Sequence, residues 1–148
     1  MPLEKYWQKR KFEKTLEPKG KVVESGLNRF VVHDHYAEKA GHHHDFRLEM
    51  GGVLKSWAVP KLVPEKPDIR RLAIQVEPHP IQYLSFAGKI PPGLYGAGTV
   101  KIFDKGTYQL IEKTPNRISF KLKGKKLKGE YLLIKTRRKN QWLLLKTK

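Results

Sequence analysis

Two adjacent glycines, Gly51 and Gly52, constrain this chain more than any other feature, because they separate two runs of alternating polar and apolar residues. A type I′ turn needs positive φ at both of its central positions, a conformation that glycine adopts without steric cost. Residues 41–50 and 53–59 are therefore predicted to be the two strands of a β-hairpin. The predicted register pairs Met50 with Val53, Leu48 with Lys55, Arg47 with Ser56, Phe46 with Trp57, Asp45 with Ala58, His44 with Val59 and His43 with Pro60.

The strand at residues 41–50 has two chemically different sides, because successive side chains of a strand point to opposite faces. One side carries His43, Asp45, Arg47 and Glu49, and the other carries His44, Phe46, Leu48 and Met50. The second side is mostly apolar and can close a core. On the first side, an imidazole and a carboxylate suit a hard or borderline divalent metal, and a guanidinium suits an oxyanion. This strand is predicted to carry a functional site.

Short alternating runs continue along the rest of the chain, without a long helical period. They cover residues 28–35, 72–77, 99–103, 107–111, 117–122, 130–135 and 141–146. Residues 104–106 are predicted to be a hairpin turn between two of these strands. Residues 88–98, with four glycines and two prolines, are predicted to be a loop. About eight short strands at this spacing are typical of a closed barrel or a sandwich, so the fold class is predicted to be mainly all-β.

The first 27 residues are charged and weakly patterned, and Pro18 and Gly20 would break any helix that reached them. We expect residues 1–27 to form an N-terminal basic arm, with short helical or extended structure. Residues 28–148 would then form the β domain. At 148 residues the chain is long enough for one domain with a single core.

The charge balance indicates the kind of partner. Lysine and arginine number 31 against 14 acidic residues, which gives a formal net charge of +17. Such an excess is typical of proteins that bind polyanions, and nucleic acid is a commoner partner than a membrane for a basic domain. The chain has no cysteine, which excludes disulfides, thiolate zinc sites and a cysteine nucleophile. It has no run near the ~20 apolar residues of a membrane span, and its first residues lack a signal-peptide core. We expect a cytoplasmic monomer.

Five of the six histidines lie within twelve positions. The six are His33, His35, His42, His43, His44 and His79. A single histidine is more often structural than a ligand, but a cluster that includes Asp45 favours a site for Mn, Fe or Zn. His42-x-His44 followed by Glu49 imitates a cupin metal motif, yet a cupin needs a histidine from a later motif and none follows His79. A non-catalytic nucleic-acid-binding barrel with a structural metal is the main alternative to a metalloenzyme.

Several longer motifs are more specific. They are Phe30-Val31-Val32 with a histidine soon after, His43-x-Asp45-Phe46-Arg47-Leu48-Glu49, Gly52-Val53-Leu54-Lys55-Ser56-Trp57-Ala58-Val59-Pro60-Lys61, Glu77-Pro78-His79-Pro80 with Tyr83, and Ile90-Pro91-Pro92-Gly93-Leu94-Tyr95-Gly96-Ala97-Gly98-Thr99-Val100. Together they closely resemble the 3′-phosphoesterase module of bacterial DNA ligase D, over residues 9–146. No ligase or polymerase segment accompanies them, so we expect a stand-alone member.

The resemblance implies a compact closed β-barrel of about eight strands that trims DNA or RNA 3′ ends with Mn²⁺ or another divalent metal. It implies two reactions. The first removes a 3′-terminal ribonucleoside and leaves a 3′-phosphate, and the second removes that phosphate to leave a 3′-hydroxyl fit for ligation. A primer-template end would be the substrate, and a separately encoded DNA ligase would be a partner.

The resemblance also implies roles for particular residues. The implied metal ligands are His35, His43 and Asp45, and the implied phosphate-binding residues are Arg47, His79 and Tyr83. A protonated His79 would neutralise phosphoryl charge together with Arg47, and a role as general acid for the leaving oxygen stays open. Three further residues match functional positions of the family, namely Lys61 and, in the N-terminal arm, Arg10 and Glu17.

The first metal ligand has two alternatives. The connection between His35 and His43 is longer than in the family pattern, and His33 stands where glutamine is usual. His33 and His42 therefore stay open as replacements for His35.

Overall fold

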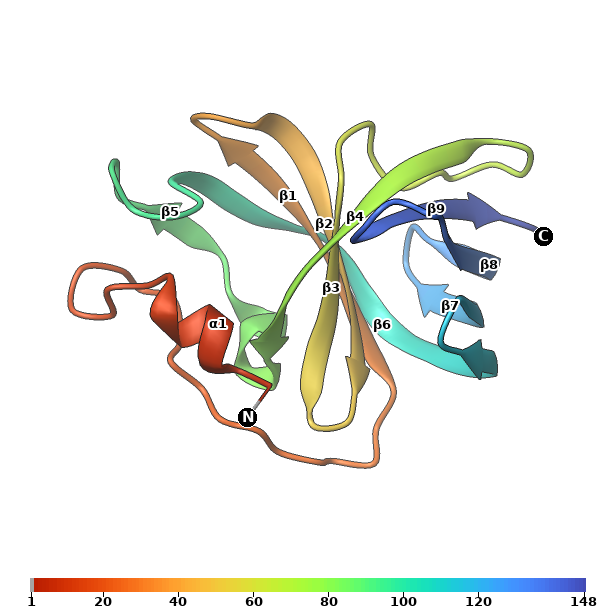
Figure 1. Ribbon diagram of the computed structural model, residues 1–148, viewed down its shortest axis with the longest axis horizontal. Coiled ribbons are helices and arrows are strands. Elements are labelled where there is room, and N and C mark those ends of the chain that lie inside the picture. Colours follow the sequence, from red (N-terminus) through yellow and green to blue (C-terminus); the bar gives the residue numbers. More distant parts are fainter. Residues whose placement is uncertain (1) are drawn as a thin grey trace.

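The computed structural model describes residues 2–148 and is built mainly from antiparallel strands (Figure 1). The strands are β1 (Arg29–Ala37), β2 (Gly41–Met50), β3 (Val53–Val59), β4 (Arg70–Pro80), β5 (Gly88–Ile90), β6 (Gly98–Thr114), β7 (Arg117–Gly124), β8 (Lys128–Lys135) and β9 (Gln141–Lys146). Two short helices accompany them, the α-helix α1 (Glu4–Gln8) and the 3₁₀ helix η1 (Ile81–Ser85). No helix within residues 2–148 has the length and apolar character to span a membrane. The predicted all-β class is confirmed.

All nine strands belong to one sheet, in the order β1-β2-β3-β4-β9-β8-β7-β6-β5. Because β1 also pairs with β6, the eight strands other than β5 form a closed ring, and β5 attaches to β6 beside it. Closure leaves the strands of the ring without unpaired edges. It also distinguishes this barrel-like arrangement from a sandwich of two separate sheets.

The hairpin around Gly51 and Gly52 has the predicted register. Both glycines have positive φ, 61° and 80°, and β2 residues 44–50 pair with β3 as expected. One face of this hairpin enters the ring, where Phe46 and Trp57 pack with apolar residues of β6 to β9. The other face points outward, so the hairpin separates the main core from the side of the sheet that carries Asp45 and Arg47.

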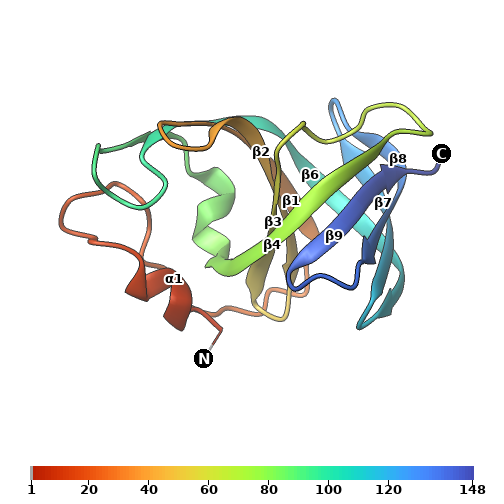
Figure 2. The same ribbon diagram turned by 45° about the horizontal axis from the view of Figure 1, so that its top comes forward.

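A second, smaller core lies on the outside of the ring. Val31 of β1 and Leu54 of β3 pack there with Tyr6 of α1 and Tyr83 of η1. Figures 1 and 2 both show α1, η1 and β5 gathered on one side of the molecule, away from β7 to β9. The N-terminal arm therefore packs onto the ring, and its residues Leu3 and Tyr6 are fully buried.

The prediction of a hairpin turn at residues 104–106 is wrong. These residues lie inside β6, a continuous strand that pairs first with β1 and then with β7. The Asp104 carboxylate instead accepts the backbone N–H groups of residues 125, 126 and 127 in the turn after β7, at 3.0, 3.0 and 2.7 Å. Gly106 permits close approach of β7, since a Cβ at this position would lie 2.3 Å from the carbonyl oxygen of Lys123. In this strand, Asp104 therefore accepts hydrogen bonds from a neighbouring turn, and Gly106 makes room for β7.

Strand β4 is longer than predicted and runs through Pro80 directly into η1. A register shift against β3, between Leu54 and Ser56, places one extra residue in β4. Such bulges re-aim the side chains beside them. In this strand, the bulge lies next to Glu77 and His79, two side chains of the outer face.

Candidate active site

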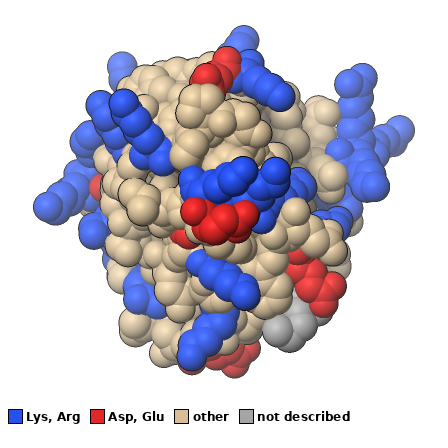
Figure 3. All heavy atoms as spheres, turned by 90° about the vertical axis from the view of Figure 1, so that its left-hand side faces the viewer, with Lys and Arg blue, Asp and Glu red and all other residues tan. Residues whose placement is uncertain are grey.

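A cavity of about 640 Å³ opens on the outer side of the ring, among β1, β2, β4, the loop after β5 and the N-terminal arm. The ionisable residues deep in its wall are Arg10, His35, His43, Asp45, Arg47, Glu77, His79 and Tyr83. All but Glu77 are predicted site residues. Figure 3 views this side of the molecule, over which Lys and Arg side chains are widely spread.

His35, His43 and Asp45 place three ligand-type atoms within 4.8 Å of one another. The pairing of β1 with β2 sets His35 opposite His43, and Asp45 follows two residues later on the same face. Nδ1 of His35 lies 3.0 Å from Asp45 Oδ2, and Nε2 of His43 lies 3.1 Å from Asp45 Oδ1. We call these three residues the outer triplet.

The second nitrogen of each imidazole shows what these contacts mean. Nε2 of His35 lies 2.7 Å from the carbonyl oxygen of Gly96, and Nδ1 of His43 lies 3.1 Å from that of Gly41. Because a carbonyl only accepts, these nitrogens carry the imidazole protons. A ring with this single proton directs its other nitrogen's lone pair at the Asp45 carboxylate, an arrangement that suits a cation between the groups. Burial opposes a second proton on His43, but the contact with Asp45 outweighs burial and raises the pKa of His43.

The outer triplet therefore fits a divalent metal. Backbone carbonyls that hold the outer nitrogen of a histidine are common partners of metal-binding histidines, and two imidazoles with one carboxylate suit Mn, Fe or Zn. Burial favours a raised pKa for Asp45, but its contacts with His35 and His43 and the charge of Arg47 hold that pKa well below its usual value. The carboxylate is thus ionised and ready for a cation.

A second group of the same composition consists of Asp34, His42 and His44, and it lies on the opposite face of the paired strands β1 and β2. We call it the inner triplet. Asp34 Oδ1 lies 2.7 Å from Nε2 of His42 and 3.0 Å from Nε2 of His44. The backbone N–H of Val63, however, donates to Nδ1 of His44 at 2.9 Å. The lone pair of His44 is therefore on Nδ1, and its protonated Nε2 faces Asp34. His42 belongs to this hydrogen-bonded group and lies away from the outer triplet.

Arg47 is held in place by three polar neighbours. Its Nε donates to Nδ1 of His33 at 3.2 Å, its Nη1 donates to Ser56 Oγ at 2.9 Å, and its Nη2 lies 3.5 Å from Asp45 Oδ2. Nε2 of His33 lies 3.0 Å from the carbonyl oxygen of Phe86. Burial, followed by the charge of Arg47, lowers the pKa of His33 to about 3. His33 is thus a neutral acceptor that positions Arg47, and His35 is the histidine of β1 beside Asp45.

His79 and Tyr83 reach the cavity from β4 and η1, with their rings packed edge to face and 4.7 Å between centroids. Nδ1 of His79 donates to the carbonyl oxygen of Glu77 at 3.0 Å, so its Nε2 accepts from Nη2 of Arg10 at 3.2 Å. Burial, followed by the charges of Arg47 and Arg10, lowers the pKa of His79 well below its usual value. His79 is therefore neutral in the unliganded site, and its predicted protonation beside a phosphate stays a prediction.

The N-terminal arm supplies Arg10 and Glu17. Arg10 donates through Nε to Glu17 Oε2 at 3.1 Å and through Nη1 to Glu77 Oε2 at 3.2 Å. The hydroxyl of Tyr83 donates to the same Glu17 oxygen at 2.7 Å. Burial, reinforced by the Glu17 charge, raises the pKa of Tyr83 well above its usual value, so the hydroxyl keeps its proton. Arm, β4 and η1 are joined through these contacts, and the cavity contains two guanidinium groups.

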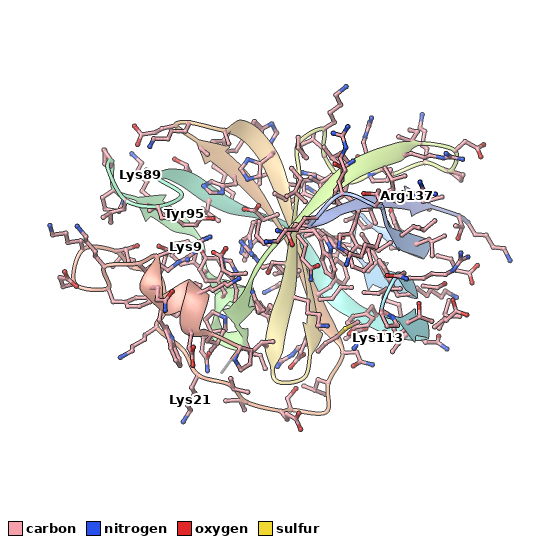
Figure 4. All side chains as sticks on the ribbon, viewed as in Figure 1. Lys9, Lys21, Lys89, Tyr95, Lys113 and Arg137 are labelled. Atoms are coloured by element: carbon pink, nitrogen blue, oxygen red, sulfur yellow. The ribbon has the colours of Figure 1, made fainter. Side chains whose placement is uncertain are left out.

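Lys61 is the predicted site residue that the fold does not bring to the others. It is exposed in the turn after β3 and does not line the cavity. At the cavity mouth, two other side chains are prominent (Figure 4). Tyr95 is 45% exposed, and the Lys9 ammonium lies 4.7 Å from the centroid of its ring.

Two residues that hold the site together, Ser56 and Glu77, are missing from the sequence-based prediction, which considered His33 only as a replacement metal ligand. Their signals were nonetheless present. His33 shares a strand face with His35, and the predicted register sets Ser56 beside Arg47. Glu77 lies two residues before His79 in β4.

The comparison with known protein families agrees with this geometry. The family model of the DNA ligase D 3′-phosphoesterase domain matches residues 33–135, which is more than half of the chain. The chain therefore belongs to the DNA ligase D 3′-phosphoesterase family.

Individual relatives are large proteins of DNA end joining. The chain is 43% identical over 158 residues to the multifunctional non-homologous end joining protein LigD of Pseudomonas aeruginosa, and this alignment covers 99% of the chain and 19% of that protein. It is 42% identical over 147 residues to the multifunctional non-homologous end joining DNA repair protein LigD of Mycobacterium tuberculosis, and this alignment covers 95% of the chain and 19% of that protein. For the multifunctional non-homologous end joining protein LigD of Mycolicibacterium smegmatis, the identity is 43% over 151 residues, and the alignment covers 93% of the chain and 19% of that protein. The chain thus spans about one fifth of the length of these curated relatives.

Proposed function

We propose that this chain is a Mn²⁺-dependent phosphoesterase that heals the 3′ ends of DNA or RNA. It would remove a 3′-terminal ribonucleoside, leaving a 3′-phosphate, and would remove a 3′-phosphate to leave a 3′-hydroxyl. The observation that carries this proposal is the outer triplet, whose two imidazole lone pairs and one carboxylate converge beside the guanidinium of Arg47.

A divalent cation held by His35, His43 and Asp45 would supply Lewis acidity toward a phosphoryl oxygen. Arg47 and Arg10 would bind the remaining phosphoryl oxygens through charge-assisted hydrogen bonds, which are preorganised by His33 and Ser56 for Arg47 and by Glu17 and Glu77 for Arg10. Because these donors are already fixed, little reorganisation accompanies the growth of charge in the transition state.

In the unliganded site, His79 and Tyr83 would hold Arg10 and the N-terminal arm in position. They would not serve there as a general acid and a general base. His79 accepts a hydrogen bond from Arg10, and Tyr83 donates to Glu17, so both side chains fix the arm against the cavity. Both also lie in the wall of that cavity. A phosphate bound there would meet two guanidinium groups in a water-poor environment, where electrostatic attraction is strong.

The formal charge of +17 supports a nucleic-acid substrate. Family membership supports a role in DNA-end repair, because the relatives are named for non-homologous end joining. A separately encoded ligase as partner, a monomeric state and a cytoplasmic location remain predictions.

Two primer-templates test the proposal, one with a 3′-terminal ribonucleotide and one with a 3′-phosphate. With Mn²⁺, the wild-type chain should convert the first to a 3′-phosphate end and both to a 3′-hydroxyl end, and a chelator should stop both reactions. Arg47→Ala should slow them by about a hundredfold or more, because one preorganised donor is worth that much. Arg117→Ala, an exposed arginine paired with Glu112 on the far strands, is the matched control and should react normally. Unchanged ends after long incubation with Mn²⁺ would support the non-catalytic nucleic-acid-binding alternative.

A further inference from the structure

A second cavity, of about 430 Å³, shares no lining residue with the first. Three strands each bring one lysine to it, Lys55 from β3, Lys113 from β6 and Lys135 from β8. Figure 4 shows Lys113 beside β6 and β7, on the other side of the molecule from Lys9 and Tyr95 at the active-site mouth.

The strand register shows that all three lysines belong to inward-facing rows. Lys113 is directly opposite the buried Ile118 in β7, and Lys135 is directly opposite the buried Trp142 in β9. Directly opposed residues share a face of the sheet. Lys55 is two residues before the buried Trp57 and therefore shares its face. Lys55 is half-buried, whereas Lys113 and Lys135 are exposed at the open end of the ring.

The cavity has hydrogen-bond donors without matching acceptors. No residue that lines it within residues 2–148 is acidic. The side chains of Lys55 and Lys113 approach each other as two donors, and burial followed by this contact lowers the pKa of Lys55. Trp57 is 0% exposed, lines the cavity, and its indole Nε1 has no hydrogen-bond partner.

Gln75 adds one more donor. Its side-chain oxygen accepts the indole N–H of Trp142 at 3.0 Å, which leaves its amide N–H groups. The cavity wall therefore combines three ammonium groups and an amide, whereas the Nε1 of Trp57 is itself buried behind the cavity surface. The excess of positive charge and of donors favours an anion.

We propose that this end of the ring binds a small oxyanion of the phosphate type, with Lys55, Lys113 and Lys135 as charged donors. An anion between the lysines would replace their mutual repulsion by charge-assisted hydrogen bonds. The Trp57 ring, which belongs to the cavity wall, would sense the bound charge. The volume suits a small ligand, and the site is separate from the proposed catalytic cavity.

The test is a titration of the full chain with inorganic phosphate, followed by ¹H–¹⁵N correlation spectra of the indole groups. The chain has three tryptophans, Trp7, Trp57 and Trp142, whose indole resonances can be assigned with single Trp→Phe variants. The Trp57 resonance should shift and saturate, both in the wild type and in Arg47→Ala, in which phosphate binding at the catalytic cavity is weakened. The Arg47→Ala variant thus distinguishes phosphate binding at the lysine cavity from phosphate binding at the proposed catalytic cavity.

Variants on the two faces of the strands complete the test. The double variant Lys113→Ala/Lys135→Ala should weaken the apparent phosphate affinity by about tenfold or more, since two charged contacts are lost. The control Lys121→Ala/Lys123→Ala removes the same charge from outward-facing positions of β7 and should bind normally. A Trp57 resonance that stays in place would overturn the proposal, because the Trp57 ring belongs to the cavity wall. Equal affinities in the two double variants would overturn it as well.

Discussion

The two triplets of the β1–β2 hairpin have the same composition and different chemistry. The outer triplet consists of His35, His43 and Asp45, and the inner triplet of Asp34, His42 and His44. In the outer triplet both imidazoles donate to backbone carbonyls and turn lone pairs toward the carboxylate. In the inner triplet a backbone N–H occupies the lone pair of His44, so protons face Asp34 instead.

Under the proposed function, this difference means that metal binding depends on the backbone groups behind the ligands. Residue types and separations are nearly the same in the two triplets, and one strand pairing generates both. What separates them is the carbonyl of Gly96 behind His35 and the N–H of Val63 behind His44. The tautomer, and with it the ability to bind a cation, follows from these partners.

The largest expected effect comes from exchanging the two carboxylates for amides. Asp45→Asn should reduce release of phosphate from a 3′-phosphate end by about a hundredfold or more, because the metal loses its charged ligand. Asp34→Asn should keep nearly wild-type activity, since an amide oxygen still accepts the two imidazole protons. Initial rates on the same primer-template measure both. Comparable losses in the two variants would mean that the triplets are not functionally distinct.

Metal affinity gives a smaller but more direct contrast. Mn²⁺ titration followed by electron paramagnetic resonance should show one tight site in the wild type. His43→Ala should weaken it by about tenfold or more, whereas the neighbouring His42→Ala should leave it unchanged. Two equivalent tight sites would contradict the tautomer assignment of the inner triplet.

Glu49 extends the comparison to stability, with the smallest expected effect. It shares the face of Asp45, but its oxygens accept from Ser25 Oγ at 2.6 Å and Arg29 Nε at 2.7 Å, so it needs no cation. Burial opposes its ionisation, but Arg29 and Ser25 outweigh burial and lower the pKa of Glu49 below its usual 4.5. This contribution is therefore present above pH 4.5 and is lost as the pH falls further.

Glu49→Gln should accordingly lower the free energy of unfolding at neutral pH by about 1–3 kcal/mol, the cost of weakened charged hydrogen bonds. The difference from the wild type should shrink in acid, as urea titrations at neutral and acidic pH can measure. Glu112→Gln, in an exposed ion pair with Arg117, is the control and should change stability little at either pH. A difference that persists unchanged in acid would show that ionisation of Glu49 is not its cause.

Local rules predicted much of the fold and part of the site. Gly51 and Gly52 set the hairpin turn, and the turn set the register that places Asp45 and Arg47 on the outer face. Alternation also separated Phe46 and Trp57 into the main core. These features depend on neighbours in one hairpin, which the sequence displays directly.

The errors and omissions have a different physical origin. Residues 104–106 are of types common in turns. Asp104 and Gly106 instead contact β7 and the turn after it, and no local sequence pattern reveals this partner. The neutral state of His79 follows from its burial, then from the charge of Arg47 on a different strand and that of Arg10, 69 positions earlier in the chain. Long-range contacts of this kind decide protonation, and they are invisible until the ring is closed.

The position of β9 has a consequence for how the protein is made. This strand, Gln141–Lys146, is the last of the chain, yet it fits between β4 and β8. On the ribosome, residues 70–74 of β4 therefore stay without their second neighbour until β9 has been made. A product that ended before β9 would leave the ring open between β4 and β8, even though every residue that lines the candidate site had already been synthesised.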